Sequence, residues 1–222
     1  MVFIIGITIL SVICIPYLYY AIKINAKGME KVPAGYVFPE YSMMWKTAIG
    51  FCLTGCLKFF VNQACYPLAY AISKVQDDEE MRVKYAMKAC NFFSGFIYFT
   101  VSASYGWSVM KDSPYLPWYL GGLVEGAGLH NVKLDTLYFA YDVAILDYSL
   151  YTFGFHIYNF FAHIFIDPRV NDFEEMLLHH IAAFCLYFCY IFGNLVPLGA
   201  PIAFLHDLAD IPGNLCKSLN ST

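Results

Sequence analysis

Imidazole and carboxylate groups crowd into two neighbouring apolar segments late in the chain. The first begins DFEEMLLHH and carries His179 and His180, and the second contains HDLAD, with His206, Asp207 and Asp210. Residues three and four apart share a face of a helix, so the last three groups can lie together. An ionisable group inside a membrane span costs about 2.5–3.5 kcal/mol on insertion scales. This concentration therefore favours a functional site over coincidence.

Such a cluster could handle protons or acyl groups. A carboxylate beside an imidazole fixes its tautomer and raises its basicity. A partly dry imidazole held in this way can act as a general base or as an acyl-accepting nucleophile. The turn between the two segments falls around 193–199, so an antiparallel helical hairpin would hold both sets of groups at similar depth.

No metal is expected at this cluster. A di-iron lipid oxidase needs several histidine boxes of the H-x-x-H-H type, and the six histidines of this chain do not have that spacing.

A second polar stripe, formed by His156, Asn159 and His163, has helical spacing. Hydrogen bonding between helices is at least as good an interpretation of this stripe as catalysis.

The elements that carry these groups are apolar enough for a membrane. The chain has 222 residues, of which 59% are hydrophobic and only 14% charged, whereas soluble domains carry about 25% charged residues. The net charge of −4 is spread along the chain, without the basic stripe of a nucleic-acid-binding protein. We therefore expect an integral membrane protein with membrane lipids as partners and no nucleic acid. A homodimer and a subunit of a membrane complex both stay open.

Hydrophobic segments predict an all-α, polytopic protein with about six transmembrane helices, since a span needs about 20 apolar residues. Lys58 interrupts the second segment and is expected to face protein or a cavity. Asp142 and Asp147 delay the expected start of the fourth, and Pro212 should kink or end the sixth. A charged link is expected at 74–88 and a loop at 110–132. The expected spans are 2–22, 47–72, 89–109, 148–166, 176–192 and about 196–219.

The paired histidines and the following HDLAD resemble the Lag motif of ceramide synthases, which belong to the TLC-domain superfamily. Three departures from the family pattern are Ala183 in place of the usual Thr, the segment 212–214 after Asp210, and a basic stretch reduced to Arg169. The positions that match the pattern are Asp172, Phe173, His179, His180, Asn194, Gly199, His206, Asp207, Asp210 and Lys217.

For the fold, this resemblance implies a partial TLC-type helical barrel. Residues 1–75 would form N-terminal membrane spans and residues 76–222 a TLC-like domain. That domain is expected to be short at its C-terminus, because the family's domain normally continues through about two more helices.

For function, the resemblance implies N-acylation of a sphingoid long-chain base by a fatty acyl-CoA. Acyl-CoA would be a co-substrate, and no cofactor is expected. The endoplasmic reticulum membrane is the expected location, with another organelle membrane as the alternative. His179 or His180 would meet the thioester, as nucleophile or base. His206, Asp207 and Asp210 would have an orienting role and would assist proton transfer from the amine. Substrate-binding roles would fall to Asp172, Asn194, Arg169 and Lys217.

A second interpretation is a catalytically degenerate TLC protein, acting as a lipid-binding or structural subunit of a membrane complex. Ala183 and the short C-terminus favour this alternative. The intact histidine and aspartate set favours the enzyme.

Overall fold

The computed structural model describes residues 41–131, 142–169 and 173–221. Over these residues the chain is helical and contains no strand, as the all-α expectation required. The predicted first span, 2–22, lies outside the described residues. The long helices are α2 (Trp45–Ile72), α3 (Glu79–Met110), α4 (Val143–Phe165), α5 (Phe173–Phe192) and α6 (Val196–Asn220), with short 3-10 turns at Tyr41–Met44, Trp118–Leu120 and Leu129–Asn131.

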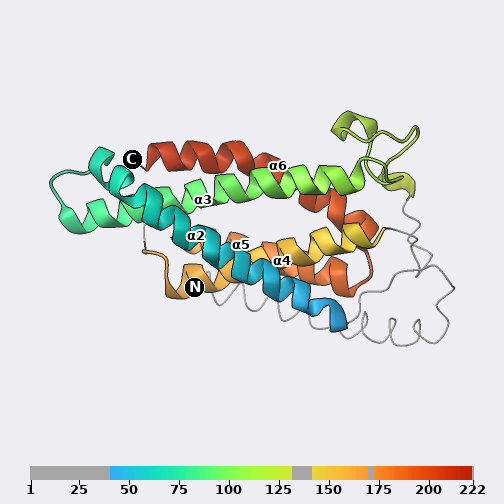
Figure 1. The fold of residues 1–222 in the computed structure, drawn as a ribbon, viewed down its shortest axis with the longest axis horizontal. Coiled ribbons are helices and arrows are strands. Elements are labelled where there is room, and N and C mark those ends of the chain that lie inside the picture. The colour runs from blue at the N-terminus through green and yellow to red at the C-terminus, as the bar shows by residue number, and fades with distance from the viewer. Residues whose placement is uncertain (1–40, 132–141, 170–172, 222) are drawn as a thin grey trace.

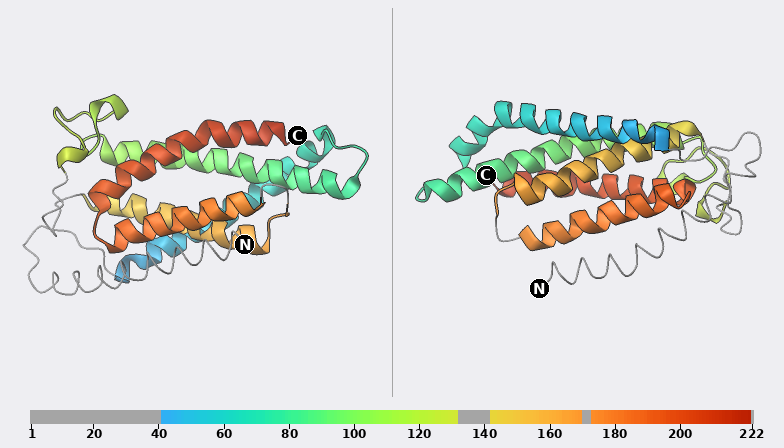
Figure 2. Two further views of the ribbon diagram at one scale, coloured as in Figure 1. Left: turned by 180° about the vertical axis from the view of Figure 1, so that it is seen from behind. Right: turned by 90° about the horizontal axis from the view of Figure 1, so that it is seen from below.

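The five long helices pack as an elongated bundle (Figure 1). Helix α3 runs beside α6, α2 packs across α4 and α3, and α5 packs against α4 and α6. Figure 2 shows α2 and α5 on opposite sides of this bundle. The hairpin predicted from the two histidine-bearing segments is therefore embedded in a larger assembly of helices.

Two helical segments of the described chain are long and apolar enough to cross a membrane, Ser42–Ile72 and Phe173–Phe192. They coincide with the second and fifth predicted spans. The expected number of about six crossings is not established by this criterion. The apolar composition and these helices fit a membrane protein.

The charged segment expected as a link between spans is mostly helix. Helix α3 begins at Glu79, ten residues before the predicted span at 89–109. The Asp78 side chain caps it by accepting a hydrogen bond from the backbone N–H of Met81 at 3.1 Å. Lys84 then pairs with Glu80 one turn earlier at 2.5 Å. The acidic residues thus stabilise the start of α3, so the charged segment is helical from Glu79 onward.

Helix α4 begins at Val143, five residues before the span predicted at 148–166. The Asp142 carboxylate caps the helix by accepting from the backbone N–H of Ala144 at 2.9 Å. Asp147 forms an ion pair with Lys46 of α2. Each of the two aspartates that were expected to delay the fourth span therefore has a specific partner.

Close contacts between helices rely on small residues. A methyl group added at Gly50 of α2 would overlap the backbone carbonyl of Tyr151 in α4, and one added at Gly154 would overlap that of Thr47. On the other side, the Ser218 hydroxyl of α6 donates to the Ala89 carbonyl of α3 at 3.0 Å. Helix α6 continues through Pro212 to Asn220, so of the two outcomes predicted at Pro212, a kink or an end of the helix, the end is not observed.

Candidate functional site

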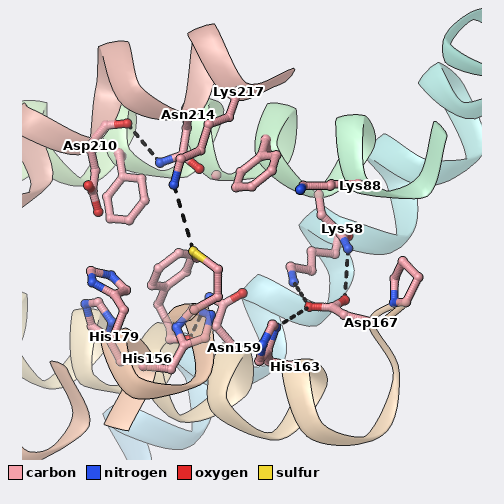
Figure 3. Close-up of a pocket in the computed structure, with 18 residues that line it drawn as sticks. Lys58, Lys88, His156, Asn159, His163, Asp167, His179, Asp210, Asn214 and Lys217 are labelled. Carbon is pink, nitrogen blue, oxygen red and sulfur yellow. Dashed lines mark hydrogen bonds and ion pairs between the residues drawn. The ribbon is translucent and has the colours of Figure 1, made fainter. Parts of the chain in front are cut away.

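A pocket of about 160 Å³ opens between α3, α4, α5 and α6, with Lys58 of α2 at one end. Figure 3 shows α6 groups on one side of it and the histidines of α4 and α5 on the other. Its lining includes His156, His179, His180 and Asp210.

His179 is an exposed side chain that lines the pocket and stacks on His206 of α6. The two ring centroids are 5.4 Å apart and the ring planes differ by 16°. Asp210 lies one turn beyond His206, and its Oδ2 is 3.5 Å from His206 Nδ1. Single ligand atoms of His179, His206 and Asp210 all lie within 4.8 Å of one another. The structure therefore brings these three predicted site residues together.

His180 faces a different neighbour. Its ring centroid lies 5.3 Å from that of His163 in α4, whose Nε2 is 2.8 Å from the backbone carbonyl oxygen of Phe173. Consecutive residues on a helix point about 100° apart, which is why the pair divides between two faces. The paired histidines thus have unequal surroundings, with His179 facing α6 and His180 facing α4.

Asp207 is fully buried behind the pocket and does not line it. Its Oδ2 accepts hydrogen bonds from the Ser102 hydroxyl at 2.7 Å and the Tyr148 hydroxyl at 2.8 Å. Its Oδ1 is 3.9 Å from His206 Nδ1. His206 also stands behind the pocket lining, between Asp207 on the core side and Asp210 on the pocket side. The HDLAD segment therefore supports the lining as well as contributing to it.

The polar stripe on α4 serves more than one purpose. His163 bonds to the backbone of α5, so the expected hydrogen bond between helices is confirmed for this residue. Asn159 donates instead to the Phe155 carbonyl in its own helix at 2.9 Å. His156 is only 2% exposed, and neither ring nitrogen has a hydrogen-bond partner among the described residues.

Lys58 faces the pocket, as expected, and lies 3.8 Å from Asp167 in the loop after α4. Asp167 also accepts from the Asn91 side chain of α3 at 2.9 Å, and its Oδ2 is 3.8 Å from His163 Nδ1. Burial alone would raise the pKa of Asp167, but the interaction with the His163 ring and the charge of Lys58 outweigh burial, so the pKa is lowered. This carboxylate joins α2, α3 and α4 at one end of the pocket. Sequence spacing could not reveal the pairing because its members are far apart in the chain.

The predicted substrate-binding residues do not converge on one place. Lys217 lines the pocket, and its Nζ lies 3.8 Å from the sulfur of Met176 and 5.3 Å from the centre of the Phe92 ring. Arg169 is exposed outside the pocket. Asn194 is buried in the α5–α6 turn, at the opposite end of α5 from His179, with a left-handed φ of 54°. Asp172 lies outside the described residues.

Two sets of side chains have the donor atoms and proximity to hold a metal ion. One is His179, His206 and Asp210, and the other combines His206 with His156 and Asp207; within each set the ligand atoms lie within 4.8 Å of one another. Imidazole nitrogen with carboxylate oxygen is a donor set typical of zinc. The metal content of the purified protein would therefore show whether these side chains bind an ion.

Comparison with known proteins places this arrangement in context. A family profile described as the TLC domain matches residues 88–222, which contain the whole histidine and aspartate cluster. Ceramide synthase hyl-2 of Caenorhabditis elegans is 27% identical over 185 residues, covering 80% of this chain and 53% of that protein. ASC1-like protein 3 of Oryza sativa subsp. japonica is 27% identical over 172 residues, covering 73% and 56%.

An ASC1-like protein of Solanum lycopersicum is 25% identical over 138 residues, covering 61% of this chain and 42% of that protein. The chain thus spans about half the length of the curated relatives that it matches. No solved structure matches it.

Proposed function

The chain belongs to the TLC-domain family, and from this premise we propose that it is a ceramide-synthase-like N-acyltransferase. Its substrates would be a fatty acyl-CoA and a sphingoid long-chain base. One observation carries the proposal: His179 lines a pocket while stacked on His206, which Asp210 and Asp207 flank. The relative named a ceramide synthase supports the choice of reaction.

The geometry suggests a route in two steps. In the first, a ring nitrogen of His179 attacks the thioester carbonyl, the carbon–sulfur bond breaks, and the imidazole proton passes to the leaving thiolate. In the second, the amine attacks the acyl-imidazole, the amide bond forms, the bond between the acyl carbon and the imidazole nitrogen breaks, and the amine proton passes to the imidazole. His206 stands where it can relay each proton, because Asp210 and Asp207 lie beside its Nδ1.

The membrane supplies the setting for both substrates. We propose that α3, α4 and α6 cross the bilayer together with α2 and α5, so that lipid tails remain in apolar surroundings while the reacting groups enter the pocket. Lys217 would meet the phosphates of acyl-CoA at the pocket, since ammonium groups pair well with phosphate. We place the protein in the endoplasmic reticulum membrane, with acyl-CoA as the only co-substrate.

Amide formation tests this proposal. The purified full chain in lipid nanodiscs is given sphinganine and palmitoyl-CoA, and products are measured by mass spectrometry. We expect N-palmitoyl sphinganine from the wild type and a rate lower by about 1000-fold or more from His179→Ala, since the nucleophile is lost.

If folded wild-type protein binds sphinganine or palmitoyl-CoA but forms no amide over a range of acyl chain lengths, the acyltransferase proposal fails. That result would instead support a lipid-binding subunit. Unchanged activity in His179→Ala would reject the proposed role of this residue alone.

A further inference from the structure

His156 of α4 is the one described histidine whose two ring nitrogens are both buried and without a hydrogen-bond partner. We propose that it is a further catalytic residue, donating a hydrogen bond to the substrate's carbonyl oxygen as that oxygen becomes an oxyanion. This inference rests on the proposed acyl transfer and adds to it a residue that lies outside the two-helix motif.

Burial makes a purely structural role for the His156 ring nitrogens difficult to explain. An unsatisfied polar group inside a protein costs about 1–3 kcal/mol, and an apolar side chain of similar shape would avoid that cost. The body of the ring packs against Tyr187, with centroids 4.5 Å apart, a contact that phenylalanine could also make. What phenylalanine could not supply is the N–H group.

The position of His156 indicates a role for its N–H group. It lines the same pocket as His179, and its ring centroid lies 5.9 Å from that of His206. It approaches from α4, whereas the other two imidazoles come from α5 and α6. A carbonyl carbon attacked by His179 would therefore have its oxygen within a pocket that His156 also lines.

The chemistry of acyl transfer needs such a donor. Attack on a thioester carbonyl, by His179 or later by the amine, moves an electron pair onto the oxygen, and the pair returns when the leaving group departs. An imidazole carries at least one N–H whether neutral or protonated, so His156 can donate to this oxygen in either state. A donor aimed at the oxyanion in a water-poor site accelerates such reactions by about 100- to 1000-fold.

Three substitutions test the assignment in the full chain. His156→Phe keeps a ring of similar size and removes the N–H, His156→Gln restores an N–H donor, and His130→Phe makes the same change at an exposed loop histidine. We expect His156→Phe to lower kcat by about 100-fold or more, with little change in KM for palmitoyl-CoA. His156→Gln should recover part of the rate, and His130→Phe should match the wild type.

Two further measurements separate catalysis from folding. The thermal midpoint of His156→Phe should equal or exceed that of the wild type, because an unpaired polar group has been removed. Binding of hexadecyl-CoA, a thioether without the carbonyl oxygen, should be the same in both proteins.

Several results would overturn the inference. Full activity in His156→Phe would do so, as would a loss of activity together with lost thioether binding or a lowered thermal midpoint. One equivalent of zinc per chain that disappears in His156→Phe would identify a metal ligand instead. A wild type that forms no amide rejects the proposed function and this inference together, whereas an active wild type with active His156→Phe rejects the inference alone.

Discussion

At the scale of single residues, the two consecutive histidines, His179 and His180, differ in the neighbours that they contact. His179 stacks on His206 at the pocket surface, and His180 lies against His163 on α4. Sequence spacing placed both at the same depth but could not say which faces α6, because the rotation of α5 depends on its packing. The same limit applies to Asp207 and Asp210, which share a helix face in the sequence but divide between core and pocket.

The difference between the two histidines predicts unequal effects of substitution. His179→Ala should lower kcat by about 1000-fold or more, since it would remove the acyl acceptor. His180→Ala should lower it by only about tenfold, through a small displacement of its neighbours. Rates of amide formation measured at saturating substrates check this, and equal losses in the two variants would show that the pair acts as a unit.

Lys217 predicts a change in substrate affinity. It lines the pocket without touching the histidine cluster, and its proposed role is to pair with phosphate. Lys217→Met should raise KM for palmitoyl-CoA about three- to tenfold, with kcat nearly unchanged, because one charge-assisted contact is lost.

The effect of Lys217→Met should shrink in high salt, which screens exposed charges. Lys111→Met is the matched control, since Lys111 lies just after the far end of α3. Equal KM values in all three proteins would remove Lys217 from the binding site.

At the scale of helices, sequence reasoning located the cores of the five long described helices, but α3 and α4 begin several residues before the predicted spans. The residues responsible are charged ones with specific partners. Asp142 caps α4, Asp147 pairs with Lys46, and Asp78 caps α3. A hydropathy pattern counts each of these aspartates only as a cost of membrane insertion. It does not include the compensating partner, which is a backbone N–H or a lysine on another helix.

The contact between α2 and α4 predicts a packing defect. A methyl group at Gly154 would overlap the Thr47 carbonyl, which belongs to backbone and cannot turn aside. Gly154→Ala should therefore destabilise the protein by about 1–3 kcal/mol, measured as a lower thermal midpoint in nanodiscs.

Gly213→Ala is the control, because a methyl group at Gly213 in α6 would meet no atom within 4 Å. An unchanged or higher midpoint is expected there, since alanine favours helix over glycine. Equal effects of the two substitutions would argue against close α2–α4 contact.

Asp167 predicts a dependence of stability on pH. The pKa of Asp167 is lowered in the folded protein. Its contribution to stability is therefore present above the unfolded-state pKa of about 3.9 and is lost as the pH falls toward the folded-state pKa. Asp167→Asn leaves Lys58 without this carboxylate. The substitution should lower the free energy of unfolding by about 3 kcal/mol near neutral pH.

The difference in thermal midpoint between wild type and Asp167→Asn should therefore narrow on acidification below about pH 4. A difference that stays constant from pH 7 to pH 3 would show that Asp167 does not act through its charge.

At the scale of the whole molecule, the α5–α6 hairpin was predictable because its chemistry lies in one continuous segment. The pocket was not, since its walls also come from α3, α4 and Lys58 of α2. His156 illustrates the difference: its spacing on α4 indicated a polar stripe, but only the packed bundle shows that it lines the pocket and has no hydrogen-bond partner among the described residues. The predicted division at residues 75 and 76 stays a prediction, and α2 packs directly on α3 and α4.

The central claim is that His179 accepts an acyl group inside this pocket. It is tested most directly by incubating the protein with palmitoyl-CoA alone, quenching rapidly, and mapping acylated peptides by mass spectrometry. We predict one palmitoyl group on the peptide that contains His179, absent in His179→Ala and discharged when sphinganine is added. Amide synthesis by a wild type that never carries an acyl group, or that carries it on a residue other than His179, would contradict the claim.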